Sequence, residues 1–515
     1  MQDVIIGTYF ISLTILFLFG SSGFVMIYYY MRHRNKKRVT AEELHVFPDV
    51  TIQLPVFNEY YVVERLIEAA CHIDYPQEKL EIQLLDDSTD ETTEIAEARI
   101  AYYKARGFDI KLIRRNSREG YKAGALKEGL KIARGEFIAV FDADFIPKPD
   151  FLKATLPHFY SDEKIGLVQT RWEHINSEYS FLTRVQAMAL DGHFVIEQSV
   201  RNKAGLFMNF NGTAGIWRKS CITDAGNWEA DTLTEDLDLS YRAQLRGWKF
   251  IYLNEVTSPA ELPSEINALK SQQFRWTKGA IETARKILPR VWRSKIPLEK
   301  KIHATFHLTN NMVFPFILIA GILNVPLIFI KHQGGYEIYF SIMAGFVFAF
   351  LGSFFFYLYS QKEIYTDWQK RMLLFPLFMA GSMGFAVNNT KAVLEGLFKK
   401  KSEFVRTPKY RVEGKEDQWS DKRYVPLKVN ATVIIEILLA LYCFFGVAAS
   451  IYYIELAAIP FQLLFSMGFG LVAALSLKHA WLARKIGIAQ QRARTISRDL
   501  ILAAVKETPE AALAE

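Results

Sequence analysis

The chain has very little cysteine, and charge is missing from several long stretches. Its three cysteines in 515 residues, Cys71, Cys221 and Cys443, lie far apart. This spacing fits neither a disulfide framework nor a zinc site, so we expect reduced thiols. The net charge of +7 is carried largely by basic clusters beside apolar segments, which indicates membrane lipids as partners and argues against nucleic acid.

The uncharged stretches are long enough to cross a bilayer. About 20 apolar residues match the hydrocarbon core, whereas a secretory signal combines a basic start with a shorter apolar run. The first stretch follows Asp3 and precedes a basic run from Arg32 to Arg38, so we interpret residues 1–31 as a retained anchor and place the next region in the cytosol. We predict five spans in all: Val4–Tyr30, Ala304–Ile330, Tyr336–Ser360, Asn430–Ile454 and Leu456–Trp481.

A further apolar segment, Met372–Val387, is shorter than these spans and runs into a polar sequence from Asn388. Counting it as a span would place the basic loop that follows on the outer side, against the positive-inside tendency. Within the membrane region 301–482 we therefore predict an interfacial or re-entrant helix at about 371–397 and a cytosolic loop at about 399–428. We interpret residues 483–515 as a cytosolic basic tail.

Residues 45–300 have an ordinary globular composition in which strand and helix patterns alternate. This alternation predicts an α/β domain with a doubly wound, Rossmann-like sheet, whose ligands bind beyond the carboxyl ends of the strands. The predicted strands are Val50–Pro55, Glu81–Leu85, Ile110–Ile113 and the run Phe137–Phe145, and the predicted helices include one ending near His72 and one at Lys122–Ala133.

The fourth of these strands ends in two carboxylates, Asp142 and Asp144. Because strand residues alternate between faces, the two should point the same way, where they would repel each other unless a hard cation lay between them. Carboxylates together with substrate phosphates are the usual ligands of Mg²⁺. Alone, such a pair is more often a solvated turn, so the interpretation as a metal site depends on the rest of the chain.

Two other strand ends also carry polar side chains, at Asn58–Glu59 and at Asp86–Asp87. The cluster after Asp86 could equally cap the next helix. Lys122 lies at the start of a helix, where an ammonium group and free backbone N–H groups form a natural seat for a diphosphate. Together these strand ends favour a nucleotide diphosphate with its metal.

Two later segments offer catalytic groups. In Thr234-Glu235-Asp236 the carboxylate of Asp236 could accept a proton from a hydroxyl nucleophile, although threonine followed by acids is also ordinary helix capping. In the helical stretch that contains Gln272, Arg275 and Trp276, the arginine could stabilise a leaving diphosphate and the tryptophan could stack on a sugar. Either could instead be an interfacial side chain.

These segments, in this order, resemble the processive family 2 glycosyltransferases: cellulose synthase and, more closely, the cellulose-synthase-like A group that makes β-1,4-mannan or glucomannan. The resemblance implies a GT-A fold, a Mg²⁺ or Mn²⁺ cofactor held by Asp142 and Asp144, and Asp236 as the general base. It implies donor contacts at Pro55, Glu59, Asp87, Lys122, Asp142 and Arg275, and acceptor contacts at Trp276, Gln272, Glu235, Asn211 and Gly212.

The activity that the resemblance implies is inverting hexosyl transfer from UDP-glucose or GDP-mannose to a growing β-linked glycan. A glycolipid synthase that adds one sugar to a lipid acceptor stays an alternative, and a receptor or a transporter fits the motifs less well. The location expected is the plasma (inner) membrane of a bacterium, or the Golgi of a eukaryote.

Two features leave alternatives open. The segment Phe404 to Lys409 is similar to the gating loop of bacterial cellulose synthase, but Arg406 stands where that motif has valine. It could therefore cap the nucleotide or be a plain basic loop. The second span contains Asn310, Asn311 and Asn324, which could line a path for a glycan or bond neighbouring helices.

Overall fold

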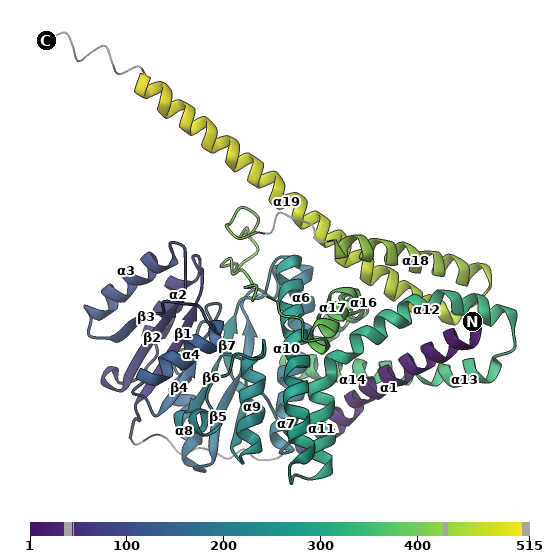
Figure 1. The fold of residues 1–515 in the computed structure, drawn as a ribbon, viewed down its shortest axis with the longest axis horizontal. Helices are drawn as coiled ribbons and strands as arrows, with labels where there is room; N and C mark the ends of the chain where they lie inside the picture. The colour runs from purple at the N-terminus through teal and green to yellow at the C-terminus, as the bar shows by residue number, and fades with distance from the viewer. Residues whose placement is uncertain (35–43, 45, 403, 426–430, 507–515) are drawn as a thin grey trace.

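The computed structural model describes residues 1–34, 44, 46–402, 404–425 and 431–506, with side chains up to Lys485. An α/β domain lies beside a bundle of long helices, and the two are joined by a layer of helices that includes α10 (Figure 1). Of the basic positions used above to orient the membrane region, Lys36, Lys37 and Arg38 lie outside the described residues. So do residues 426–430 of the predicted loop and 507–515 of the predicted tail.

The α/β domain is built on a single sheet of seven strands in the described residues, in the order β3-β2-β1-β4-β6-β5-β7. The first four pair in parallel, β6 is antiparallel to both of its neighbours, and β5 and β7 are again parallel. The strands are β1 (Val50–Val56), β2 (Leu80–Asp86), β3 (Asp109–Arg114), β4 (Phe137–Val140), β5 (Ile165–His174), β6 (Gly215–Arg218) and β7 (Lys249–Ala260).

Helices cover both faces of this sheet, which confirms the doubly wound α/β class. Alternate residues of β1, such as Ile52, pack with α2 (Val63–Cys71) and α3 (Thr92–Lys104) in one buried apolar cluster. On the other face, residues such as Ile138 of β4 pack with α4 (Tyr121–Ile132), α8 (Lys219–Asp224) and α9 (Glu235–Leu245). The short elements η1 (Gln77–Lys79), α5 (Phe151–Thr155) and η2 (Leu156–Tyr160) complete the domain up to β5.

The strand that carries the paired carboxylates is shorter than predicted. β4 ends at Val140, because Gly215 of β6 is its last partner in the ladder, and the chain then turns through Asp142 and Asp144. We predicted that both carboxylates point the same way because strand residues alternate between faces. That reason was wrong, because neither Asp142 nor Asp144 lies in the strand. The turn brings them to the same place by another route, held by a backbone bridge between Phe145 and Ala260.

The layer between the sheet and the long helices contains α6 (Phe181–Asp191), a π-helical segment η3 (Gly192–Gln198), α7 (Ser199–Lys203), α10 (Ile266–Arg293) and α11 (Leu298–Thr309). A buried ion pair at 2.8 Å between Lys270 of α10 and Glu436 ties this layer to the bundle. The predicted helix containing Arg275 and Trp276 is thus confirmed as α10, and it connects the two halves of the molecule.

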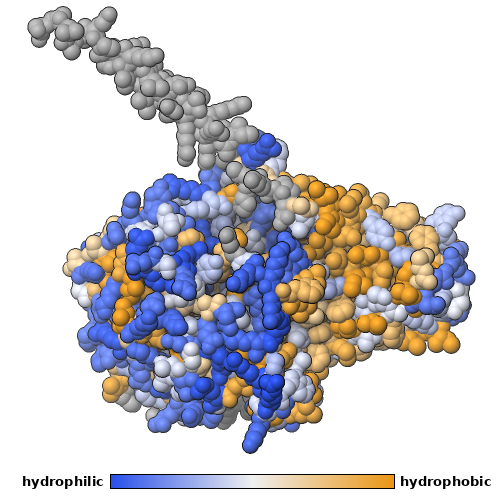
Figure 2. Space-filling model, viewed as in Figure 1, coloured by the Kyte–Doolittle hydropathy of each residue, from blue (hydrophilic) through white to orange (hydrophobic). Residues whose placement is uncertain are grey.

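Five helical segments among the described residues are long and apolar enough to cross a membrane, in agreement with the five predicted spans. Their outer surface is strongly hydrophobic, unlike that of the α/β domain (Figure 2), and a large exposed apolar surface suits contact with lipid. They are Gln2–His33 (α1), Leu298–Gln333 (α11, η4 at Asn310–Met312 and α12 at Val313–Gln333), Glu337–Ile364 (α13 at Glu337–Gly345 and α14 at Phe348–Ile364), Thr432–Tyr452 (α18) and Leu456–Lys485 (η5 at Leu456–Ala458 and the first part of α19, Ile459–Lys506).

The predicted interfacial segment is not among these five. It is broken into three short helices, α15 (Trp368–Met372), α16 (Phe375–Gly384) and α17 (Ala386–Leu397). α16 approaches α19 so closely that a Cβ added at Gly384 would lie 2.2 Å from the backbone oxygen of Gly468. This segment therefore packs on a long helix through backbone contact instead of forming a long helix itself.

The loop after α17 lies against the α/β domain. Glu413 pairs with Arg65 at 2.7 Å, and Arg423 pairs with Glu91 at 2.6 Å. The other end of residues 368–397 also meets this half of the molecule, since Arg371 of α15 pairs with Glu178 at 3.0 Å, while α17 packs on α10.

Candidate active site

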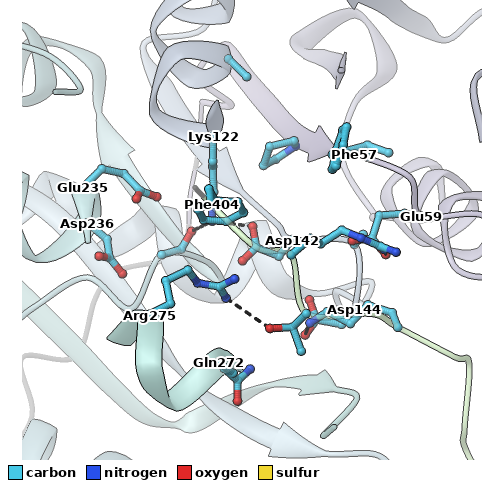
Figure 3. A pocket seen from close by; sticks show the side chains of 18 of the residues that line it. Phe57, Glu59, Lys122, Asp142, Asp144, Glu235, Asp236, Gln272, Arg275 and Phe404 are labelled. Atoms are coloured by element: carbon cyan, nitrogen blue, oxygen red, sulfur yellow. Dashed lines mark hydrogen bonds and ion pairs between the residues drawn. The ribbon is translucent and has the colours of Figure 1, made fainter. Parts of the chain in front are cut away.

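One cavity lies where the carboxyl ends of β1, β2 and β4 meet the first turns of α4 and α9 and the stretch from Gln272 to Trp276 of α10 (Figure 3). Every site residue predicted from the sequence lines it, although these residues are spread from Pro55 to Trp276 along the chain. They are Pro55, Glu59, Asp87, Lys122, Asp142, Asp144, Asn211, Gly212, Glu235, Asp236, Gln272, Arg275 and Trp276.

Each carboxylate of the Asp-x-Asp pair is held by a lysine. The Nζ of Lys122 lies 2.5 Å from Oδ1 of Asp142 and also donates to the carbonyl of Gly212 at 2.8 Å, and Asp144 forms an ion pair with Lys409. Two carboxylates in one turn supply the oxygen ligands that a hard divalent cation prefers, and the two lysines occupy the oxygens that such a cation would take. The residues present therefore fit a metal ion, with Asp142 and Asp144 as its ligands.

Asp236 lies in the first turn of α9, with Glu235 beside it. Its Oδ1 accepts the backbone N–H of Leu237 at 2.8 Å, which fixes the orientation of the carboxyl group. Burial and the neighbouring Glu235 raise the pKa of Asp236 to about 7. A carboxyl group with a pKa near neutrality can both accept and release a proton under physiological conditions, as a general base must.

Gly212 leaves room for this carboxylate. Its φ of +82° is a conformation that L side chains rarely adopt, and an added Cβ would lie 3.0 Å from Oδ2 of Asp236. Glycine is therefore needed here for both backbone and space.

Asn211 is held by its neighbours and not turned freely into the cavity. Its Nδ2 lies 2.8 Å from Nε2 of His193, and its Oδ1 accepts from Gln198 at 2.5 Å. Glu197, which pairs with His193 Nδ1 at 2.9 Å, fixes the ring. Because each end of the amide already has one protein partner, Asn211 serves to shape the wall of the cavity at least as much as to bind a ligand.

Two further acidic side chains, Glu59 and Asp87, follow the carboxyl ends of β1 and β2. Asp87 forms a bidentate ion pair with Arg115, whose Nε donates to Oδ1 at 3.0 Å and whose terminal nitrogen donates to the other oxygen. Glu59 pairs with Arg406 at 2.8 Å. Burial raises the pKa of Glu59 to about 7 in spite of that arginine.

The segment Phe404 to Lys409 forms one wall of the cavity. Arg275 donates to the carbonyl of Val405 at 2.9 Å, and its guanidinium lies 4.7 Å from the ring centre of Phe404. With Arg406 on Glu59 and Lys409 on Asp144, the loop pairs with two of the carboxylates that line the cavity. Of the two interpretations left open by the sequence, the geometry favours a loop that covers the cavity.

Several lining residues were missed by sequence reasoning. Phe57 and Arg118 reach the cavity from a turn and a loop. A lone arginine before a helix, or a lone aromatic residue in a turn, is too common to stand out. No local pattern in the sequence could have identified them.

The asparagines of the second predicted span have protein partners. Asn324 accepts a long bond of 3.4 Å from Tyr9 of α1, and Asn311 accepts one of 3.3 Å from Thr277 of α10. Asn310 bonds Asn311 at 2.9 Å. These contacts favour helix-to-helix bonding for Asn324, whereas Asn311 joins the first membrane helix after the domain to the helix that carries Trp276.

Comparison with known proteins agrees with this geometry. Residues 48–279 match the family model described as "Glycosyltransferase like family 2". The chain is 41% identical over 302 residues to glucomannan 4-beta-mannosyltransferase 1 of Oryza sativa subsp. japonica, covering 56% of this chain and 58% of that protein. It is 44% identical over 265 residues to glucomannan 4-beta-mannosyltransferase 2 of Arabidopsis thaliana, covering 50% of each.

The matched region thus spans between half and three-fifths of the curated relatives' length. Among solved structures, a mannosyltransferase from Pyrobaculum calidifontis in complex with GDP-Man and Mn²⁺ is similar, with a TM-score of 0.53 and 18% identity. The match covers 76% of this chain and all of that one. This similarity shows the GT-A fold.

Proposed function

We propose that the chain, whose residues 48–279 form a glycosyltransferase family 2 domain, is a membrane-integrated inverting hexosyltransferase that extends a β-linked polysaccharide from a nucleotide-sugar. The observation that carries this proposal is the single cavity that joins an Asp-x-Asp turn, a buried carboxyl of raised pKa and an arginine on the helix leading into the membrane. Because the curated relatives are named mannosyltransferases, mannose is the sugar we propose.

In this function the donor would bind at the carboxyl ends of β1, β2 and β4. Glu59 and Asp87 lie where a nucleoside would bind, and Lys122 and Arg275 would contact the diphosphate. Asp142 and Asp144 would hold a divalent cation, Mg²⁺ or Mn²⁺, which neutralises charge on the departing diphosphate. Arg275 already faces the cavity with a planar guanidinium (Figure 3), a group well suited to phosphate oxygens.

Transfer itself needs a hydroxyl nucleophile on the face opposite the diphosphate. Asp236 would accept the proton of that hydroxyl as the bond to the anomeric carbon forms and the bond to the diphosphate breaks. One displacement of this kind inverts the configuration, so no second carboxylate has to form a covalent intermediate. Trp276 and Gln272, on α10, would hold the acceptor sugar.

The position of α10 supports a polymeric product. Its residue Thr277, next to Trp276, bonds Asn311 of the first membrane helix after the catalytic domain. A glycan stacked on Trp276 would therefore have its far end directed toward the membrane helices, as a growing chain requires.

The contacts of the loop support the proposed topology. Because the loop of residues 404–425 and α17 both pack on parts of the catalytic half, residues 371–397 need not cross the membrane. We infer that the catalytic domain, the loop and the tail lie in the cytosol, at a bacterial plasma membrane or a Golgi membrane.

The proposal is tested by giving membranes that contain the protein a panel of labelled nucleotide-sugars with Mg²⁺ or Mn²⁺. We expect labelled material that a β-1,4-mannanase degrades and that organic solvent does not extract, and none from membranes with the Asp236→Asn variant. Label found only in a solvent-soluble lipid with one sugar would instead establish a glycolipid synthase.

A further inference from the structure

A chain of hydrogen bonds leads from the cavity wall into the layer of helices behind it. Its members are Asn211, which lines the cavity, and His193, Glu197 and Gln198 of the π-helical segment η3. A π-helix closes its hydrogen bonds over five residues, so residues four and five positions apart lie on one side of it. This geometry lets both His193 and Gln198 meet Asn211.

One end of the chain fixes which way the amide of Asn211 is turned. Nε2 of Gln198 lies 2.8 Å from the backbone carbonyl of Asn209, which can only accept a hydrogen bond, so this nitrogen is the donor. It donates its other hydrogen to Oδ1 of Asn211 at 2.5 Å. Nδ2 of Asn211 is therefore the end that faces His193, and it lies 2.8 Å from Nε2 of the ring.

The other end of the chain fixes the tautomer of His193. Nδ2 of Asn211 can only donate, so Nε2 of the ring is unprotonated and Nδ1 carries the hydrogen. Nδ1 donates that hydrogen to Glu197 at 2.9 Å. Although burial opposes ionisation, Arg201 holds the pKa of Glu197 well below its usual range, and the two side chains pair at 2.8 Å. An ionised carboxylate thus holds the neutral ring in one tautomer.

This orientation leaves one N–H group of Asn211 unused. Nδ2 carries two hydrogens, and among the described residues His193 is its only acceptor. The next residue, Gly212, lies between the proposed base and the donor site, because its carbonyl accepts from Lys122 at 2.8 Å and an added Cβ would lie 3.0 Å from Oδ2 of Asp236. Since Asn211 lines the cavity beside Gly212, its second N–H group is available to a sugar that approaches Asp236.

We propose that His193 is a positioning residue for the acceptor. It holds the amide of Asn211 so that the free N–H group donates to an oxygen of the acceptor sugar. If the ring were lost, the amide would keep only its bond to Gln198 and could turn about it. His193 itself is not among the residues that line the cavity, so it acts through Asn211. This inference rests on the proposed function and adds a residue that the sequence motifs do not include.

Two substitutions separate the two hydrogen bonds of the ring. In His193→Gln the amide reaches about as far as Nε2 did, so it can still accept from Asn211 but has no group at the place of Nδ1. In His193→Asn the amide reaches about as far as Nδ1 did, so it can still donate to Glu197 but leaves Asn211 without its acceptor. His72→Asn is the matched control, because Nδ1 of His72 also bonds an oxygen four residues away, at 2.7 Å, and His72 lies outside the cavity.

The assay uses the purified full-length protein in detergent with Mn²⁺. It measures transfer from labelled GDP-mannose or UDP-glucose to a β-1,4-linked oligosaccharide of the same sugar at increasing oligosaccharide concentration. We expect His193→Asn to lower kcat/KM for the oligosaccharide roughly five- to tenfold, the usual cost of one lost hydrogen bond, and His193→Gln to lower it less than about threefold. Binding of the nucleoside diphosphate, measured by calorimetry, should change less than about twofold in both, and His72→Asn should match the wild type.

An equal loss in His193→Asn and His193→Gln would mean that the bond to Asn211 is not what the ring supplies, and would overturn the inference. Unchanged use of the oligosaccharide in His193→Asn would overturn it as well. So would a parallel fall in nucleotide affinity, because the whole wall of the cavity would then have moved. A wild type that transfers neither sugar would instead refute the proposed function, and the inference with it.

Discussion

Lowering the pH should slow sugar transfer by protonating Asp236. Burial and the nearby Glu235 raise the pKa of this carboxyl group to about 7, so about nine-tenths of it is ionised at pH 8 and about one-tenth at pH 6. Only the ionised form can accept the proton of the acceptor hydroxyl. The value of kcat/KM should therefore fall about tenfold between pH 8 and pH 6.

The substitution Asp236→Asn separates this group from the others. The amide oxygen can still accept the N–H of Leu237, so the first turn of α9 should be preserved. We expect transfer to fall by about 100-fold or more, the usual cost of a lost general base, and the remaining rate to be independent of pH over this range. Nucleotide binding should stay within a few-fold of the wild type.

The assay is the initial rate of label incorporation into polymer in buffers of constant ionic strength. Glu59→Gln is the control, because burial also raises the pKa of Glu59 to about 7. If the pH dependence disappears in Glu59→Gln and persists in Asp236→Asn, the assignment of the base is refuted. Retention of more than a few per cent of the rate in Asp236→Asn would refute it as well.

The stability of the folded state should depend on pH in the opposite direction to the rate of transfer, because it should fall as the pH rises. A carboxyl group whose pKa is raised in the folded state stabilises that state below its ordinary pKa, and the contribution is lost as the pH rises through the folded value. At pH 8 the wild type must keep Asp236 ionised while buried, whereas asparagine carries no charge. Asp236→Asn should therefore unfold at a temperature no lower than that of the wild type at pH 8, as measured by thermal denaturation in detergent.

Three further predictions concern the loop, the cavity wall and the topology. Lys409→Met should tighten Mn²⁺ binding by about tenfold or more, measured by spin resonance, because Asp144 loses a competing charged hydrogen bond; unchanged or weaker binding would contradict this. Gly212→Ala should slow transfer more than Gly205→Ala. Both glycines have positive φ, so alanine costs about 1–3 kcal/mol of backbone strain at each, but an added Cβ meets other atoms only at Gly212. Equal transfer rates in the two variants would argue against a role of Gly212 in the site. A single cysteine at Gln418 should not react with an impermeant thiol reagent in intact cells, and reaction there would mean that residues 371–397 cross the membrane.

Much of the catalytic domain could be predicted because its first half follows local rules. β1, β2 and β3 are short apolar runs bounded by turn residues, and their structural bounds differ from the predicted ones by one residue at most ends. The strands of the second half, β5, β6 and β7, were not predicted. β6 is only four residues long, Gly215–Arg218, and it forms because it inserts between β4 and β5. A pairing of this kind depends on contacts between distant segments, which no local pattern in the sequence reveals.

The predicted site residues all reached one cavity, yet the sequence could not show how they are paired. The ion pair between Lys409 and Asp144 joins residues 265 positions apart, and that between Arg406 and Glu59 joins residues still further apart in the sequence. A motif identifies the carboxylate, but its partner is set by the path of a loop across the whole domain.

The position of the loop that contains Arg406 and Lys409 depends on the charge in the donor site. Arg406 and Lys409 each neutralise a carboxylate that is largely buried, with side-chain exposures of 8% for Glu59 and 11% for Asp144. Withdrawing the loop would leave both charges without these partners, and removing one partner of a buried pair typically costs about 3–5 kcal/mol. A divalent cation at Asp144 supplies the charge that Lys409 otherwise provides, so binding of the metal and the donor lowers the cost of moving the loop. Loop motion is thereby coupled to the occupancy of the site by charge alone. Because this coupling acts through the pair of Lys409 with Asp144, a substitution that removes Lys409 should make the position of the loop insensitive to metal.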